Sequence, residues 1–400
     1  MKPVEILKDI FWVGTVDWQR RNFHGYSISP RGTTYNCFLV KDEKITLFDT
    51  VPQTDAGKLL CNIAHVIEPE KIDYIVVNHV EMDHSGALPR IVEKVKPEKI
   101  FCSKMGLRAL KAHFDCESWP IEVMETGSSL NIGKRNISFV ETRMLHWPDS
   151  MVSYIAEDKA LICNDAFGQN WATSERFADE VERGELTRQL IRYYANIVLP
   201  YSPIVEKILE TIEGMGIDID YVLPDHGLLL RGDDVAWVFN KYKEFAAQKP
   251  TMKAVVLFDT MWKSTEKMAA AVADGLAEEG LSVTIMDLKA NDHSDVMEEI
   301  QEAGAVCVGS PTHNNGILPK VADMLTYMKG LKPQNKVGCA FGSYGWSGES
   351  VKVITEYLTA MGMELPASPV KALYVPRHDV LAQCVELGRT VGKAVKAKIG

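Results

Sequence analysis

Short apolar strands alternate with helical segments from residue 254 to the end of this 400-residue chain. The apolar runs lie at 254–258, 283–286, 305–309 and 336–341, and polar loops and helical patterns separate them. Strands that alternate with helices in this way are typical of a parallel sheet covered by helices on both faces. We therefore expect a doubly wound α/β domain over residues 254–400.

The preceding residues have a different pattern, a dense mixture of short strands and loops. Apolar runs at 74–77 and 160–163 are typical of buried strands. An amphipathic helix over 233–248, followed by Pro250, ends this part of the chain. At roughly 150 residues per domain, the length suits two or three domains. We place the first at 1–249 and the second at 254–400.

Composition excludes several classes of function. A net charge of −10 argues against general affinity for nucleic acid. No apolar run approaches the ~18 residues of a membrane-spanning helix, so we expect no membrane partner. The eight cysteines include no C-x-x-C pair, which argues against thiolate zinc knuckles and rubredoxin-type iron sites. Scattered cysteines of this kind indicate reduced thiols, and we expect the protein in the cytoplasm.

A cluster of metal-capable side chains is the strongest chemical signal. His79, Glu81, Asp83 and His84 fall within six positions directly after the strand 74–77. Because alternate side chains of an extended backbone point the same way, we expect the first three to converge, with His84 turning in as a helix begins. Packed so closely, these groups are costly unless a cation or solvent satisfies them. The cluster therefore predicts a metal site.

Three further candidate ligands each follow a predicted strand. Each could also be a cap or a turn residue, but loops after buried strands are frequent positions for active-site residues in α/β folds. The residues and strands are His146 after 137–145, Asp165 after 160–163, and His226 after 221–223.

A hydroxyl-rich loop follows the strand 254–258 and precedes a helix, which is the setting of an anion site. Neither a P-loop nor a G-x-G-x-x-G motif is present, and the loop resembles the phosphate loop of flavodoxins. The resemblance implies FMN as cofactor. The candidate FMN ligands here are Thr260, Met261, Trp262, Lys263, Ser264 and Thr265.

Two later loops, after the strands 305–309 and 336–341, resemble the other FMN loops of flavodoxins. Their small residues allow the backbone to approach a flavin, and Trp346 or Tyr344 could stack on its ring. The candidates are Ser310, Pro311, Thr312, His313, Asn314 and Asn315 in one loop, and Ser343, Tyr344, Gly345, Trp346 and Gly348 in the other.

The cluster after strand 74–77 also resembles the His-x-His-x-Asp-His motif of the metallo-β-lactamase superfamily. Here Glu81 stands at the second histidine of that motif. A carboxylate in place of an imidazole, together with Asp83 and Asp165, makes the site harder and favours iron over zinc. His-x-Glu-x-Asp-His on this scaffold resembles the flavodiiron proteins.

The resemblance implies a role for each candidate residue. One iron would take His79, Glu81 and His146, the other Asp83, His84 and His226, and Asp165 would bridge them. The segment 24–36 resembles the opening segment of the family, where a histidine lies near the substrate pocket. His24, Tyr193 and Tyr194 are the candidates for that pocket.

The resemblance covers essentially the whole chain and implies fold, activity and partners. Residues 1–249 would form a metallo-β-lactamase-like αββα sandwich and 254–400 a flavodoxin-like domain. Reduced rubredoxin would pass electrons through FMN to the two irons, which would reduce dioxygen to water or nitric oxide to nitrous oxide. A head-to-tail homodimer would set the FMN of one subunit beside the irons of the other.

Two other functions are open on the residues alone. The first is a zinc-dependent hydrolase of the metallo-β-lactamase type with a flavodoxin-like accessory domain. The second is an electron carrier without enzymatic activity, in which the metal site is structural.

Overall fold

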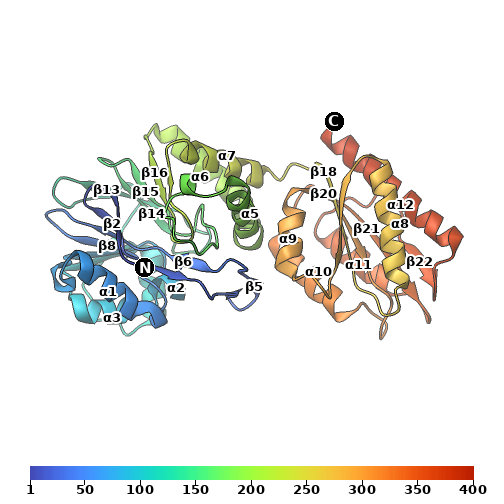
Figure 1. Ribbon diagram of the computed structural model, residues 1–400, viewed down its shortest axis with the longest axis horizontal. Coiled ribbons are helices and arrows are strands. Elements are labelled where there is room, and N and C mark those ends of the chain that lie inside the picture. Colours follow the sequence, from blue (N-terminus) through green and yellow to red (C-terminus); the bar gives the residue numbers. More distant parts are fainter. The chain divides into compact units, whose positions relative to one another are not determined.

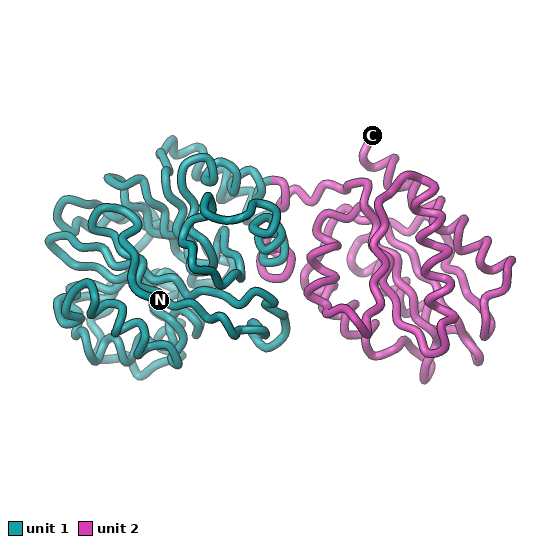
Figure 2. Tube along the Cα trace, in the orientation of Figure 1, with its two compact units in different colours: residues 1–193, 203–243 teal, residues 194–202, 244–400 magenta.

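The computed structural model describes residues 1–400 and divides into two compact units (Figure 2). Residues 1–193 and 203–243 form the first unit, and residues 194–202 and 244–400 form the second. None of the helices is both long and apolar enough to cross a membrane.

Two sheets form the middle of the first unit (Figure 1). The first has the order β1-β2-β7-β8-β9-β10-β11 and the second the order β12-β13-β14-β15-β16-β17. The strands of the first are β1 (Val4–Leu7), β2 (Ile10–Trp12), β7 (Phe38–Val40), β8 (Thr46–Phe48), β9 (Tyr74–Val77), β10 (Lys99–Ser103) and β11 (Ile121–Met124). Those of the second are β12 (Ser129–Asn131), β13 (Asn136–Glu141), β14 (Met151–Ile155), β15 (Ala160–Ile162), β16 (Tyr221–Leu223) and β17 (Leu230–Arg231).

Helices cover the outer faces of the two sheets, which gives the expected αββα sandwich. Figure 1 shows α1 and α3 on one side and α6 and α7 on the other. The core between the sheets takes Phe38 and Phe48 from the first and Phe139 and Ile162 from the second. The helices are α1 (Ala56–Val66), α2 (Met82–Ser85), α3 (Leu88–Val95), α4 (Lys104–His113), α5 (Arg183–Tyr193), α6 (Ser202–Met215) and α7 (Asp233–Ala247).

Short elements complete the first unit. They are the strand pairs β3 (Thr15–Asp17) with β6 (Thr33–Tyr35) and β4 (Asn22–Phe23) with β5 (Ser27–Ile28), and 3-10 turns at Gln53–Asp55, Pro69–Lys71 and Ala178–Glu180.

The second unit is a five-stranded parallel sheet in the order β19-β18-β20-β21-β22. This order, with helices on both faces, is that of the flavodoxin-like fold and confirms the predicted fold class. The strands are β18 (Thr251–Phe258), β19 (Ser282–Asp287), β20 (Ala303–Gly309), β21 (Val337–Tyr344) and β22 (Val370–Leu373). The helices are α8 (Ser264–Glu278), α9 (His293–Glu302), α10 (Pro319–Leu331), α11 (Ser350–Ala360) and α12 (His378–Ile399).

A segment from the middle of the sequence also belongs to the second unit. It consists of a π-helical turn, Tyr194–Val198, and a 3-10 turn, Leu199–Tyr201. Asn196 fixes it there, because its amide donates to the carbonyl of Ser294 (3.2 Å) and its side-chain oxygen accepts from the hydroxyl of Tyr327 (2.8 Å). No local sequence signal indicated this pairing.

One predicted strand is shorter than expected. The strand predicted at 137–145 ends at Glu141 as β13, and a turn follows. Leu145 N–H donates to the carbonyl of Thr142 (2.9 Å), and Met144 has a φ of 65°. The predicted strand was drawn through to residue 145, but the backbone of 142–145 forms this turn and carries His146 to the candidate site.

Candidate metal centre and cofactor pocket

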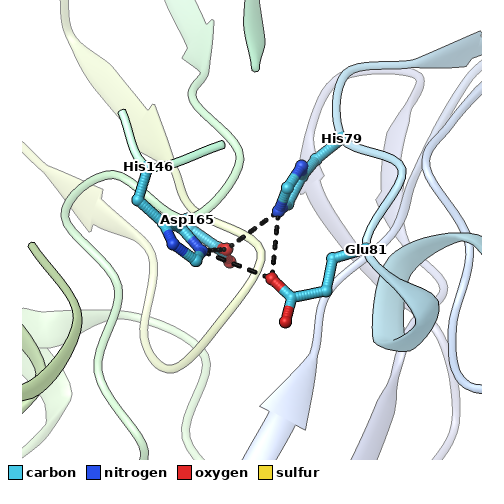
Figure 3. A group of neighbouring side chains, drawn as sticks. All are labelled: His79, Glu81, His146 and Asp165. Carbon is cyan, nitrogen blue, oxygen red and sulfur yellow. Dashed lines mark hydrogen bonds and ion pairs between the residues drawn. The ribbon is translucent and has the colours of Figure 1, made fainter. Parts of the chain in front are cut away.

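The first set of donor atoms comes from four residues on three loops, which follow β9, β13 and β15 (Figure 3). His79 follows β9, Glu81 caps α2, His146 lies in the turn after β13 and Asp165 follows β15. Oε2 of Glu81 lies 3.3 Å from Nε2 of His79 and 3.3 Å from Nε2 of His146. Each residue offers one donor atom, and all four lie within 4.8 Å of one another.

The second set lies beside the first and contains Asp83, His84 and His226. Nε2 of His226 is 3.3 Å from Oδ2 of Asp83, and Nε2 of His84 is 3.5 Å from the same oxygen. The three donor atoms again lie within 4.8 Å of one another. His84 therefore faces this set with Nε2.

Asp165 faces both sets, one with each carboxylate oxygen. Oδ2 lies 2.8 Å from Nε2 of His146 and 3.4 Å from Nε2 of His79. Oδ1 lies 3.1 Å from Nε2 of His84 and 3.3 Å from Nε2 of His226. This is the geometry of a carboxylate that can bridge two cations.

The local backbone explains the division into two sets. The chain is extended only through Glu81, and α2 begins at Met82. Asp83 and His84 are therefore helical, and their donor atoms group with His226. Glu81 nevertheless has donor atoms within 4.8 Å of those of His79 in one group and of those of Asp83 and His24 in another, so it adjoins both of its alternate neighbours.

Several buried donor atoms at the candidate metal site have no hydrogen-bond partner, which is the state expected of atoms that bind cations. A buried polar atom left without a partner costs about 1–3 kcal/mol, more if the group is charged. Such atoms gather in and beside the second set: both oxygens of Asp83, both ring nitrogens of His84, Oδ1 of Asp165 and Nε2 of His226. The mixture of imidazole and carboxylate donors suits a first-row transition metal.

The electrostatics of the site keep its carboxylates ionised. Burial raises the pKa of Asp165, but the imidazole of His84 and a hydrogen bond with His146 outweigh burial and hold the pKa well below its usual value. Burial lowers the pKa of His84, but Asp83 and Asp165 raise it to about 10. The carboxylates of Glu81, Asp83 and Asp165 thus place negative charge beside the imidazoles, and bound cations would interact favourably with that charge.

Outer contacts orient the imidazole rings. Nδ1 of His79 lies 3.1 Å from Oδ2 of Asp149, and Nδ1 of His226 lies 2.7 Å from the backbone carbonyl of Thr34. When each Nδ1 donates its proton outward, Nε2 is left as the atom that faces the site. Sequence reasoning missed Asp149, because no local motif announces a contact between positions 79 and 149.

The three residues predicted for the substrate pocket lie in different places. Nε2 of His24 is 2.9 Å from Oε1 of Glu81. The ring of Tyr193 is centred 6.0 Å from that of His226, and its buried hydroxyl has no hydrogen-bond partner. Tyr194 packs instead within the second unit, where its hydroxyl is 3.0 Å from Oγ of Ser202. The structure thus brings His24 and Tyr193 to the metal centre, but not Tyr194.

A separate pocket lies at the carboxyl ends of the parallel strands in the second unit, where a doubly wound sheet binds its ligand. Trp346 is 83% exposed and Trp262 is 90% exposed, so both rings are open to a ligand. The pocket is lined by Thr260, Met261, Trp262, Ser264, Pro311, Thr312, Ser343, Tyr344, Gly345, Trp346 and Tyr374.

The remaining predicted flavin residues do not line this pocket. Oγ of Ser310 accepts from Leu318 N–H (3.0 Å), and Thr265 lies 3.4 Å from Ser343 through their hydroxyls, so both shape the loops from behind. The others are Lys263, His313, Asn314, Asn315 and Gly348. Tyr374 was missed, although it directly follows β22 and the position after a parallel strand was the signal used for the other loops.

Two family descriptions match the chain. Residues 33–227 match the ODP family beta lactamase, and residues 256–388 match flavodoxin. The first range contains every candidate metal ligand, and the second contains every candidate flavin residue.

Curated relatives match over the full length. The chain is 53% identical to rubredoxin-oxygen oxidoreductase of Megalodesulfovibrio gigas over 400 residues, which is 100% of both chains. It is 43% identical to nitric oxide reductase of Moorella thermoacetica over 396 residues, covering 98% of this chain and 99% of that one.

Solved structures show the same likeness. Rubredoxin oxygen:oxidoreductase from Desulfovibrio gigas superimposes with a TM-score of 0.99 at 53% identity and covers 100% of both chains. The flavodiiron protein from Giardia intestinalis has a TM-score of 0.96 at 32% identity and covers 100% of this chain and 98% of that one.

The sandwich with two adjoining donor sets and the flavodoxin-like unit define a flavin-dependent metalloprotein of the oxidoreductase class. With relatives this similar over the whole length, the chain belongs to the flavodiiron protein family. Its cofactors are accordingly FMN and a non-haem diiron centre.

Proposed function

We propose that this protein takes electrons from reduced rubredoxin and reduces dioxygen to water. The observation that carries the proposal is Asp165, whose two oxygens face two separate sets of nitrogen and oxygen donors. A pair of metal ions that shares one carboxylate suits a two-atom substrate. The 53% identical relative is named a rubredoxin-oxygen oxidoreductase, which supports both the donor and the substrate.

The proposed ligands are those that the geometry groups. His79, Glu81 and His146 would hold one iron, and Asp165 would bridge it to the second. Asp83, His84 and His226 would hold that second iron. The assignment of His84 is supported by its Nε2, which lies 3.1 Å from Oδ1 of Asp165 and 3.5 Å from Oδ2 of Asp83.

The proposed FMN site is the pocket in the second unit. The hydroxyls of Thr260 and Ser264, at the start of α8, would hold the phosphate. Trp346 and Tyr344 would contact the flavin ring. We add Tyr374 to this set, because it lines the same pocket and the sequence pattern had not included it.

The stoichiometry fits a four-electron reduction. When bound, the reduced iron pair and reduced FMN each supply two electrons, the four that O2 + 4 H+ + 4 e− → 2 H2O requires. The side chains of the protein position the metal ligands and shield the site from solvent. His24 holds the outer oxygen of Glu81, so that Oε2 alone faces the donor set. Tyr193 presents a buried hydroxyl without a protein partner beside His226.

We also propose a head-to-tail homodimer, with the protein in the cytoplasm as the cysteine pattern predicts. The metal donors belong to the first compact unit and the flavin pocket to the second. A dimer in which each flavin serves the partner's irons would bring the two cofactors together. Sedimentation together with activity measurements tests this, since a monomer with full turnover would contradict it.

Nitric oxide is a second substrate that one observation favours. A relative that is 43% identical over nearly the whole chain is named a nitric oxide reductase. Two metal positions that share Asp165 could each take one molecule, according to 2 NO + 2 H+ + 2 e− → N2O + H2O.

The deciding experiment measures the metal and flavin content of the purified protein, followed by uptake of each gas with reduced rubredoxin as donor. We expect two irons and one FMN per chain and rapid loss of dioxygen. Zinc without iron would favour the hydrolase, which the relatives do not favour. Reduction of the flavin without gas uptake would favour the electron carrier.

A further inference from the structure

A small apolar cavity lies within the first unit, between the second sheet and α6. Its lining comes from the outer face of that sheet, from two loops and from helices α6 and α7. The residues are Thr142, Leu145, Val152, Leu161, Cys163, Ala166, Phe167, Val205, Ile208, Leu209, Ile212 and Tyr242.

The cavity borders two of the three loops that deliver candidate ligands from the second sheet. Leu145 directly precedes His146, and Ala166 directly follows Asp165. Its opposite wall is α6, where Ile208 is only partly buried. The cavity therefore lies between the surface of α6 and the residues next to the metal centre.

The polar groups around the cavity leave little for water to bind. The thiol of Cys163 donates to the carbonyl of Ala166 (3.1 Å), and the hydroxyl of Tyr242 accepts from Phe167 N–H (2.6 Å). Oγ1 of Thr142 is the lining atom that has no hydrogen-bond partner. A buried water typically makes about three hydrogen bonds, so one free hydroxyl does not make a water site.

The size of the cavity suits a diatomic molecule. Its volume is about 20 Å³. One water needs a cavity of roughly 10–15 Å³, so this one holds little more than one small molecule. Protein interiors contain few voids of this size, and each weakens packing.

We propose that this cavity binds the apolar gas substrate, dioxygen or nitric oxide, on its way to the metal centre. The inference rests on the proposed function for the identity of the gas. Small molecules of low polarity leave water readily for an apolar space. A gas held there would contact Leu145 and Ala166, the neighbours of His146 and Asp165 in sequence. Binding in the cavity would therefore raise the gas concentration next to the ligand loops.

Krypton is the probe for the cavity, because it is apolar, close to dioxygen in size and unreactive. In crystals of the loaded wild-type protein pressurised with krypton, we expect the gas between Leu209 and Ala166. Leu209→Ala should enlarge the cavity and increase krypton occupancy. Krypton absent from the wild type, or an ordered water there bound to Thr142, would overturn the proposal.

Kinetics test whether the cavity serves the substrate. Leu209→Phe fills the space from α6, and Thr211→Phe adds the same ring to the exposed side of that helix as a matched control. With equal iron and FMN content, the filled variant should show a several-fold lower kcat/KM for dioxygen at unchanged kcat, and the control should match wild type. If kcat/KM is unchanged in the filled variant, the cavity is only a gap in the packing and the proposal is wrong.

The two failures can be told apart. If the loaded wild-type protein consumes neither gas, the proposed function fails, and with it the substrate role of the cavity. If the wild-type protein consumes gas but krypton stays out of the cavity, only this inference fails. Should Leu209→Phe not fold, krypton binding to the wild type and to Leu209→Ala still decides.

Discussion

Nδ1 of His79 and Oδ2 of Asp149 lie 3.1 Å apart, and the same oxygen accepts from the N–H of Val80 at 2.7 Å. Both side chains are buried. This carboxylate contacts the side of the His79 ring that faces away from the candidate metal site, so we expect iron affinity to depend on a residue that does not itself face the metal.

Asp149→Asn tests that dependence. The amide keeps the shape but loses the charge that holds the proton on Nδ1 of His79. We expect about a 10- to 100-fold loss of iron affinity, the range typical when such partners are removed. Iron content and competition with a chelator measure it. Asp115→Asn, at an exposed site, is the control, and equal iron affinity in the two variants would refute a positioning role for Asp149.

Glu81→His tests the choice of iron over zinc. The exchange restores the imidazole of the zinc motif and removes an oxygen that lies 3.3 Å from the Nε2 atoms of His79 and His146. A softer site should retain iron less well and zinc better, and reductase activity should be lost. Metal analysis after purification and gas uptake measure both effects. Unchanged iron retention and turnover would remove this reason for assigning iron.

Tyr193→Phe and Tyr194→Phe should have opposite effects. The hydroxyl of Tyr193 has no partner within the protein, so its removal should not lower the free energy of unfolding but should lower gas-reduction turnover. The hydroxyl of Tyr194 pairs with Ser202, so its removal should cost about 1 kcal/mol of stability and leave turnover unchanged. Denaturant unfolding and gas uptake separate the two. Full turnover in Tyr193→Phe would remove that residue from the substrate pocket.

Trp346→Ala should weaken FMN binding. Stacking on an aromatic ring contributes about 0.5–1.5 kcal/mol beyond buried area, which is roughly a 2- to 10-fold change in affinity. Flavin retained through gel filtration and titration of the apoprotein with FMN measure the loss. Ile285→Ala, another exposed apolar residue of the second unit, is the control. An unchanged FMN affinity would show that Trp346 does not stack on the flavin.

The buried amino group of Lys336 should make the free energy of unfolding depend on pH. Burial lowers the pKa of its amino group from 10.5 to about 7 in the folded protein. The unfolded chain then binds more protons between pH 7 and pH 10.5, so the free energy of unfolding should rise with pH across this window, by at most about 1.4 kcal/mol per pH unit. Comparing Lys336→Met with wild type isolates this contribution. Parallel stability curves for the two proteins would contradict the assignment.

The sequence predicted best those features that residues close together in the chain determine. Four metal-capable side chains in six positions predicted the metal site, and the alternation of strands and helices predicted the doubly wound fold of residues 254–400. The division into two donor sets followed only from the family resemblance. The local alternation did not indicate it, because it depends on the start of α2 at Met82. Asp149 could not be predicted either, since only the folded sandwich brings position 149 to position 79.

Other differences arise from tertiary packing. The predicted strand extended through 142–145, yet the backbone turns there and brings His146 to the site. Tyr193 and Tyr194 are neighbours in sequence, yet α5 ends at the first, and a π-helical turn that belongs to the second unit begins at the other. Tyr374 could have been predicted, because it directly follows the last parallel strand and the loops after the other strands were the ones chosen as flavin loops.

The shared carboxylate of Asp165 has a consequence for how the protein acquires its metals. With a single ion bound, one of its oxygens would still face two imidazoles across an incomplete shell. The first ion to arrive thus orders the carboxylate that the next one needs. Metallation should therefore be cooperative, and titration of the apoprotein with ferrous ion should pass from empty to doubly loaded chains with few half-filled ones between.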